Sequence, residues 1–279
     1  MSSSPATHQY AESPNACASP RTERAEGKSR LKDIYDGYFQ ILQAETEEQR
    51  QQAFRLRYQV YCVEYPYEDP ARNPGEMERD AYDDISRHAL LMHRKSGSLV
   101  GAVRLILPKN DGREMRLPIR DVCRHEFIME DRPELPRSRT AEISRFAVSK
   151  DFRRRAHEDT SVGSFTMPGD DPRRIIPNTS LGLMQAIVSM AAQEDVSHLC
   201  AVMEPFLLRM LRKLGIHFHK LGPEVEYHGH RQPCYSDLDE LLTRIWLERR
   251  DVWELITDDG KLWPLNAAVA VPTLAVSAA

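Results

Sequence analysis

Charged side chains interrupt the most strand-like segments of this sequence. Glu142 and Arg145 stand three residues apart in the run AEISRFAV, and Arg104 is the single charge in GAVRLIL. Burying a charge is costly unless an opposite charge meets it, so each of these residues needs a partner from elsewhere in the chain. Any fold for this sequence must therefore bring acids and arginines that are distant in sequence together beside its strands.

Regular strand alternation would keep Glu142 and Arg145 apart. Successive side chains of a strand point to opposite faces, so Glu142 and Ser144 would share one face while Arg145 pointed to the other. A β-bulge adds one residue to one strand and resets this alternation. We therefore predict a bulge near Ile143 or Ser144, which would turn Glu142 and Arg145 toward one cleft.

The periodicity of the apolar residues predicts an α/β domain with a mixed sheet. Residues 47–65 read as a helix that carries Ala53, Leu56 and Val60 on one stripe and Phe54, Arg57 and Tyr61 on the next. The runs 88–94 and 99–108, separated by KSGS, predict a hairpin. There follow a strand at 142–149, a polar loop at 153–177, a helix at 178–193, a strand at 197–203, a helix from Pro205 that ends at Gly215, and a strand at 216–220.

Composition divides the chain into a central domain and two tails. Residues 1–28 consist of Ser, Ala, Pro and charged residues with almost no large apolar side chain, which is typical of a disordered tail. Residues 29–263 are expected to form one domain, whose C-terminal part, 236–258, is an amphipathic helical segment that covers the sheet or the substrate tunnel. Residues 264–279 are expected to be a flexible tail.

Charge and cysteine content favour a cytoplasmic protein. The net charge is only −4, which argues for neither nucleic acid nor a membrane surface as a general partner. No apolar run reaches the roughly 18 residues of a membrane span, and no secretory signal opens the sequence. The five cysteines are scattered and lack CxxC spacing, as expected for reduced thiols: Cys17, Cys62, Cys123, Cys200 and Cys234.

Two further groups of polar residues invite a functional interpretation. The segment EMERDAYDD crowds Glu78, Asp80, Asp83 and Asp84 ahead of the hairpin, where they could pair with Arg104 or simply form a polar turn. The second group has HxH spacings and consists of His217, His219, His228 and His230, with Cys234. Strand alternation and a polar loop explain this group, and no set reproduces a known ligand spacing, so no metal site is predicted.

The ordered motifs resemble a known family. Arg57 and Tyr61, then ERDAYDD, VGAVRLIL and AEISRFAV, are similar to the acyl-homoserine-lactone (autoinducer) synthases and the N-acyl amino acid synthases of the Gcn5-related N-acyltransferase superfamily. The resemblance runs from about residue 54 to 148, and LLRMLRKLGI with the following strand extends it to about 221. More narrowly, the chain resembles the acyltransferases associated with PEP-CTERM/exosortase systems. The fold this implies has a mixed, mostly antiparallel central sheet flanked by helices.

The resemblance also implies an activity and a set of site residues. The protein would move a fatty acyl group from an acyl-carrier-protein or coenzyme A thioester, its co-substrate, to the amine of a small acceptor, an amino acid, without a tightly bound cofactor. Glu142 would take the amine proton, directly or through water. The family's other catalytic positions fall on Arg145 and Arg104, and its substrate-binding positions on Arg57, Tyr61, Asp80, Asp83, Phe146 and Val148. Tyr65 or Tyr67 stands where the family has tryptophan, which leaves the acceptor open.

Five arginines near the strand that ends at residue 149 suggest where the acyl donor binds. They are Arg153, Arg154, Arg155, Arg173 and Arg174. In a resembling enzyme they would bind the donor's phosphates or dock the strongly acidic acyl carrier protein, although a solvated charged loop has the same composition. Two alternatives also stay open for the whole chain: a lactone synthase that uses S-adenosylmethionine, and a non-catalytic module that binds acyl groups or carrier protein.

Overall fold

A mixed sheet of eight strands forms the centre of the computed structural model, which describes residues 30–108, 117–152 and 179–264. The strand order is β1-β2-β3-β4-β5-β8-β6, with β7 paired to β8 beside this path. Among the described strand pairs only β4 with β5 is parallel. The strands are β1 Phe39–Gln43, β2 Ser86–His93, β3 Ser98–Ile106, β4 Thr140–Val148, β5 His198–Met203, β6 His219–Lys220, β7 Val225–Glu226 and β8 His230–Asp237. The expected mixed, mostly antiparallel sheet is confirmed.

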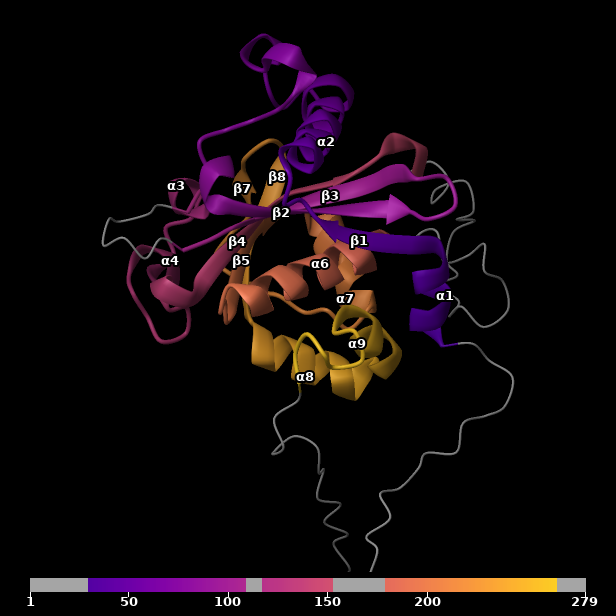
Figure 1. The fold of residues 1–279 in the computed structure, drawn as a ribbon. Helices are drawn as coiled ribbons and strands as arrows, with labels where there is room; N and C mark the ends of the chain where they lie inside the picture. The colour runs from indigo at the N-terminus through magenta and orange to yellow at the C-terminus, as the bar shows by residue number, and fades with distance from the viewer. Residues whose placement is uncertain (1–29, 109–116, 153–178, 265–279) are drawn as a thin grey trace, which may run out of the picture.

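Helices cover both faces of this sheet (Figure 1). On one face α2 (Glu47–Tyr58) lies over β2, β3 and β4, and on the other α6 (Thr179–Gln193) packs against β1 to β4. Helix α9 (Arg250–Ile256) packs on α6, on α8 (Leu238–Glu248) and on α1 (Leu31–Tyr38). Helix α7 (Pro205–Lys213) follows β5, and the short helices α3 (Ile119–Val122) and α4 (Glu126–Met129) precede β4.

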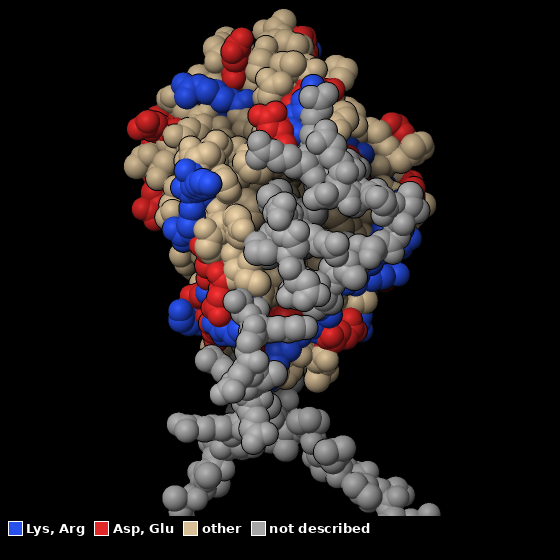
Figure 2. All heavy atoms as spheres, turned by 90° about the vertical axis from the view of Figure 1, so that its right-hand side faces the viewer, with Lys and Arg blue, Asp and Glu red and all other residues tan. Residues whose placement is uncertain are grey.

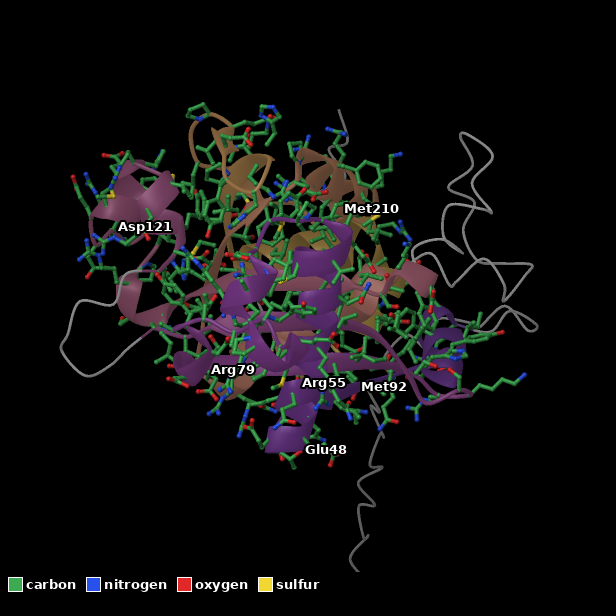
Figure 3. The ribbon with its side chains drawn as sticks, turned by 90° about the horizontal axis from the view of Figure 1, so that it is seen from above. Glu48, Arg55, Arg79, Met92, Asp121 and Met210 are labelled. Carbon is green, nitrogen blue, oxygen red and sulfur yellow. The ribbon has the colours of Figure 1, made fainter. Side chains whose placement is uncertain are left out.

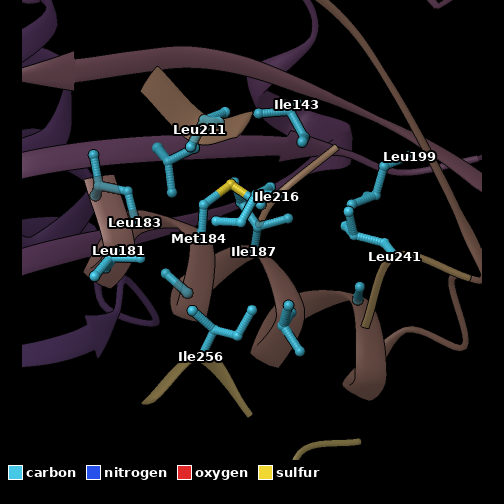
Figure 4. Close-up of a cluster of buried hydrophobic side chains, with 14 of the residues drawn as sticks. Ile143, Leu181, Leu183, Met184, Ile187, Leu199, Leu211, Ile216, Leu241 and Ile256 are labelled. Atoms are coloured by element: carbon cyan, nitrogen blue, oxygen red, sulfur yellow. The ribbon is translucent and has the colours of Figure 1, made fainter. Parts of the chain in front are cut away.

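The largest apolar core lies between the sheet and the layer formed by α8 and α9, with α6 at its centre (Figure 4). Because α6 is enclosed on almost all sides, its sequence is apolar nearly all round. Gly182 lets α6 approach β2 and α1: its backbone N–H donates to the Tyr35 hydroxyl at 3.0 Å, and a Cβ there would lie 2.7 Å from Leu91 Cδ1. A smaller apolar cluster lies under α2 on the opposite face.

Helix α2 brings Arg57 to the sheet. It begins with a capping box, in which Thr46 accepts from the Gln49 backbone and the Gln49 side chain accepts from Thr46. Ala53 and Leu56 pack on the sheet, and Arg57 is buried on the same side. The predicted helix at 47–65 is confirmed, except that its last part, Gln59–Glu64, is a π-helix.

Most elements predicted from periodicity are present. The hairpin is β2 and β3, the helix at 178–193 is α6, the strand at 197–203 is β5, and α7 begins with Pro205 and is followed by Gly215 at φ 80°. Three predictions need correction. Strands β1, β7 and β8 were not expected, the strand at 216–220 shrinks to β6, and the 236–258 segment breaks at Arg249 into α8 and α9.

The predicted tail 1–28, the loop 153–177 and nearly all of 264–279 lie outside the described residues, and the domain bounds stay a prediction. On the described part of the face in Figure 2, acidic and basic side chains are interspersed. Within the described ranges no helix has the length and apolar character needed to cross a membrane. The four described cysteines, Cys62, Cys123, Cys200 and Cys234, are buried free thiols.

Candidate active site

A bulge interrupts β4 at Arg145. Ala102 of β3 pairs with Ala147 and Arg104 with Ser144, so the single residue Val103 faces two residues of β4, Arg145 and Phe146. Arg145 has φ 51°, the left-handed conformation that non-glycine residues seldom adopt. The predicted bulge is therefore present, but it lies at Arg145–Phe146 and not at Ile143 or Ser144. The left-handed turn of Arg145 itself makes room for the extra residue.

The bulge resets the direction of the side chains as the sequence required. Before it, Ser144 points to the α2 side, where its hydroxyl accepts from Arg104 Nε at 2.8 Å. After it, Ala147 packs in the cluster under α2, whereas Phe146 packs against the core on the α6 side. Arg145 therefore points to the same side as Ser144, and alternation places Glu142 there too.

Arg57 and Arg104 are buried and bound by acids of the segment ahead of β2. Arg57 Nε donates to Glu78 at 2.5 Å, and its two terminal nitrogens donate to Asp83 at 2.7 and 3.2 Å. Arg104 Nη1 donates to Asp80 at 2.6 Å and to Asp83 at 2.7 Å, and Nη2 donates to Asp80 at 2.9 Å. With Ser144 on Nε of Arg104, every nitrogen of both guanidinium groups has a protein partner.

Arg145 joins this network from the bulge. Its Nη2 lies 2.8 Å from Glu78, 2.8 Å from Glu68 and 3.4 Å from Asp80, and its Nε donates to Glu78 at 3.1 Å. The guanidinium also lies over the Tyr61 ring, 5.3 Å from its centroid. Three arginines and four carboxylates thus form one cluster, which leaves an excess of one negative charge.

The arginines determine the charge state of these acids. Burial alone would raise the pKa of Glu78, but the charges of Arg57 and Arg145 outweigh burial and lower it to about 2. For Asp83 burial acts in the same upward direction, and Arg57 and Arg104 hold its pKa well below its usual range. Both acids are therefore ionised at neutral pH.

Glu142 has the opposite environment. It is 3% exposed, and its carboxylate accepts a hydrogen bond from the Ile119 backbone N–H at 2.9 Å at the start of α3. Within the described residues no arginine forms an ion pair with Glu142, whereas Arg57, Arg104 and Arg145 all pair with other acids. Burial raises the pKa of Glu142 to about 8, despite that hydrogen bond and the nearby charges of Arg104 and Arg145.

A cavity of about 820 Å³ adjoins Glu142. Strands β4 and β5 pair only from Thr140 with His198 to Ile143 with Ala201. The cavity lies where the two strands separate beyond these pairs. One part of its wall is polar and the other is apolar. The polar part includes Tyr61, Glu68, Asp80, Arg145 and Tyr227, and the apolar part includes Phe146, Val148, Phe152, Met203, Leu207 and Met210. Figure 3 looks down on α2, with Asp121 of α3 and Met210 of α7 on opposite sides.

The comparisons with known proteins agree with this architecture. Residues 56–162 match the family model described as an acetyltransferase (GNAT) domain. This part of the chain carries a GNAT acyltransferase domain. The expected fold and the expected enzyme class, an N-acyltransferase, are confirmed at the level of this domain. Among curated proteins no sequence matches the chain.

Solved structures with the same fold include a CoA-dependent acyl-homoserine lactone synthase. TofI, in a ternary complex with an inhibitor and MTA, is 21% identical at a TM-score of 0.53, covering 82% of this chain and 99% of its own. BjaI, a CoA-dependent acyl-homoserine lactone synthase solved with MTA, is 19% identical at a TM-score of 0.50, covering 85% of this chain and 90% of its own. FeeM, an N-acyl amino acid synthase from uncultured soil microbes, is 13% identical at a TM-score of 0.49, covering 74% of this chain and 93% of its own.

The structure brings most of the predicted site residues together around one cavity. Tyr61, Asp80, Arg104, Glu142, Arg145, Phe146 and Val148 line it, and Arg57 and Asp83 lie behind it in the ion cluster. Their roles stay predictions. The five arginines predicted to receive the donor, Arg153, Arg154, Arg155, Arg173 and Arg174, lie outside the described residues.

Sequence reasoning missed four contributors to the site. Glu78 was noted only as part of an acidic patch, although it links Arg57 to Arg145. Glu68, Tyr227 and Arg231 were not singled out, and all three line the cavity. They come from loops or from the unpredicted strand β8, where no periodic pattern marks a side chain as facing inward.

Proposed function

We propose that this protein is an N-acyltransferase that moves a fatty acyl group from a thioester to the amine of a small acceptor, an amino acid. The donor would be acyl carrier protein or coenzyme A. The observation that carries the proposal is the position of Glu142, a buried carboxyl with a pKa of about 8 beside a cavity at the parting of β4 and β5. A general base with a pKa near the working pH is suited to accept the proton of an attacking amine.

The transfer can be written with the residues at hand. The amine nitrogen attacks the thioester carbonyl carbon, a C–N bond forms, and the C–S bond breaks. The amine gives up a proton, which ionised Glu142 accepts directly or through a water, and the departing thiolate takes up a proton. Beyond Ile143 the edge of β4 no longer pairs with β5, so its backbone N–H groups can donate to the donor's pantetheine arm or to the developing oxyanion.

The shape of the cavity supports a fatty acyl donor. The side chains of Phe146, Val148, Phe152 and Met203 give one part of the wall the apolar surface that an alkyl chain requires. The polar part, with Glu68 and Asp80, lines the same cavity as Glu142 and offers an amine a place to bind. Acyl carrier protein as the physiological partner, and the narrower link to PEP-CTERM/exosortase systems, stay predictions.

The experiment is a direct search for product. The purified full chain is incubated with long-chain acyl carrier protein or acyl-CoA, together with the amino acids and S-adenosylmethionine, and N-acyl products are identified by mass spectrometry. We expect an N-acyl amino acid from the wild type and at least a hundredfold less from Glu142→Gln. An intact thioester with every acceptor would refute the proposal.

A second candidate, an acyl-homoserine lactone synthase that uses S-adenosylmethionine, is favoured by the fold shared with BjaI. The same incubation separates the two, because an acyl-homoserine lactone has a different mass and its synthesis consumes S-adenosylmethionine. A non-catalytic acyl-binding module would retain the thioester without turning it over.

A further inference from the structure

The site must hold the acceptor's carboxylate somewhere if the acceptor is an amino acid, and the ion cluster is poorly suited to do so. This inference rests on the proposed function. Arg57 and Arg104 have no nitrogen left without a protein partner, and both are almost fully buried. A carboxylate that bound them would have to displace Glu78 or Asp83, which are buried, or Asp80, and the displaced acid would lose its own partner.

Arg145 is also an unfavourable anchor. One of its terminal nitrogens, Nη1, makes no described hydrogen bond, but the guanidinium already lies among Glu68, Glu78 and Asp80. A fourth carboxylate at this point would meet the excess negative charge of the cluster. The cluster is therefore better suited to attract the ammonium end of an amino acid than its carboxylate end.

Arg231 is placed differently. It is the second residue of β8, where this strand pairs with β7, and it lines the cavity with its side chain 13% exposed. Its guanidinium lies over the Tyr67 ring, 5.5 Å from the centroid, and its Nη1 donates to the His230 carbonyl at 3.1 Å. Stacking and this hydrogen bond fix the fork in place before a ligand arrives.

The acid that balances Arg231 is easily exchanged. Its ion-pair partner is Glu204 at 3.2 Å, whose side chain is 52% exposed. An ion pair with one partner mostly in water contributes little, so a substrate carboxylate can replace Glu204 at low cost. Of the arginines that line the described cavity, Arg104 and Arg145 belong to the ion cluster, and Arg209 lies exposed on α7 against Phe206.

We infer that Arg231 is the acceptor-carboxylate site, and that the acceptor is an α-amino acid with a free carboxylate. Tyr67 contacts Arg231, and the next residue along the chain, Glu68, belongs to the ion cluster. Glu68 is 28% exposed and is bound to Arg145 at 2.8 Å. A zwitterionic amino acid fits this polarity, with its carboxylate on Arg231 and its amine toward Asp80 and Glu142. A planar guanidinium can bind the carboxylate in two places at once.

The test compares amino acids with their methyl esters, which retain the amine but lack the negative charge. The twenty protein amino acids, and in parallel their methyl esters, are offered with long-chain acyl carrier protein to the wild type and to Arg231→Gln. The measured quantity is the acid-over-ester preference, the ratio of the rate with an amino acid to the rate with its methyl ester. We expect Arg231→Gln to lower this ratio by about 10- to 100-fold, because hydrogen bonds to charged groups contribute about 1.5–3 kcal/mol. The matched control, Arg209→Gln, removes the same side chain from the rim and should leave this preference unchanged.

A binding measurement makes the test independent of turnover. Saturation-transfer nuclear magnetic resonance on the same amino acid mixture should show at least one bound amino acid with the wild type and none with Arg231→Gln, whereas Arg231→Lys retains part of the signal. Thioester left intact by the wild type would count against the proposed function alone, and the binding result would still decide the role of Arg231. An unchanged acid-over-ester preference in Arg231→Gln, or amino acid binding that this variant retains, would overturn the inference.

Discussion

The titration of Glu142 should determine how the rate depends on pH. With a pKa of about 8, only about one Glu142 side chain in ten is ionised at pH 7 and half are ionised at pH 8. If ionised Glu142 is the base, its contribution to kcat/KM should rise about tenfold from pH 6 to 7 and about fivefold from pH 7 to 8, and then level off. An ordinary exposed glutamate would give no rise in this range.

The acceptor amine also loses its proton as the pH rises, so the rate must be separated into two contributions. Glu142→Gln retains the shape of the side chain and an oxygen that can accept from the Ile119 N–H, but it cannot titrate. The ratio of wild-type to variant rates, measured by N-acyl product formation from pH 6 to 9.5, isolates Glu142. If the two profiles run parallel over this range, the reasoning about Glu142 as a titrating base is wrong.

Stability provides an independent measurement of the same pKa. The folded-state pKa of Glu142 is raised above the reference value of 4.5, so the folded state holds the proton more tightly than the unfolded state does. The stability that this contributes is fully present below pH 4.5 and is lost as the pH rises toward 8, at up to about 1.4 kcal/mol per pH unit. Urea unfolding at pH 5 and pH 8.5 should show this loss in the wild type and not in Glu142→Gln. An equal pH dependence in both proteins would contradict the shifted pKa.

Three further predictions concern the frame of the site. Glu78 has a lowered folded pKa of about 2, so its stabilising contribution should be lost as the pH falls from about 4.5 to 2, and Glu78→Gln should show a shallower acid denaturation curve by circular dichroism. Asp83→Asn leaves two buried guanidinium groups short of a carboxylate and should cost about 3–5 kcal/mol in urea unfolding, whereas a loss under 1 kcal/mol would contradict the buried pairing. Gly182→Ala should lower stability by about 1–3 kcal/mol because its methyl group meets the Tyr35 hydroxyl and Leu91, and an unchanged melting temperature would show that the helix can shift.

The sequence predicted the components of the site better than their connections. Arg104, Glu142 and Arg145 could be singled out because they are charged residues inside strands, and a buried charge needs a partner. The bulge followed from alternation alone, although its position was off by one or two residues. Alternation shows only that a bulge must lie somewhere near these two side chains. Which residue adopts the left-handed conformation depends on the tertiary contacts of its side chain, and here that residue is Arg145.

The residues that hold the charges could not be predicted in the same way. Glu78 and Glu68 lie in irregular segments, where no period relates sequence position to direction. The strand β8 was missed because HRQPCYSD mixes polar and apolar residues and contains Pro233, although the strand is stabilised by its pairing with β5. Arg231 belongs to that strand, so its place in the cavity wall followed only from the tertiary fold.

The ion cluster explains why a left-handed arginine can persist in the middle of the sheet. A non-glycine residue in this conformation costs roughly 1–2 kcal/mol, and Arg145 is held there by ion pairs with Glu78 and Glu68. Glu78 is in turn bound to Arg57 of α2, so the helix, the acidic segment and the bulge form one connected unit. The bulge begins two residues after the last pairing of β4 with β5 at Ile143. The charges in and behind the cavity wall thus stabilise the strand geometry that opens the cavity, and Glu142, left outside their ion pairs, retains the raised pKa that a base requires.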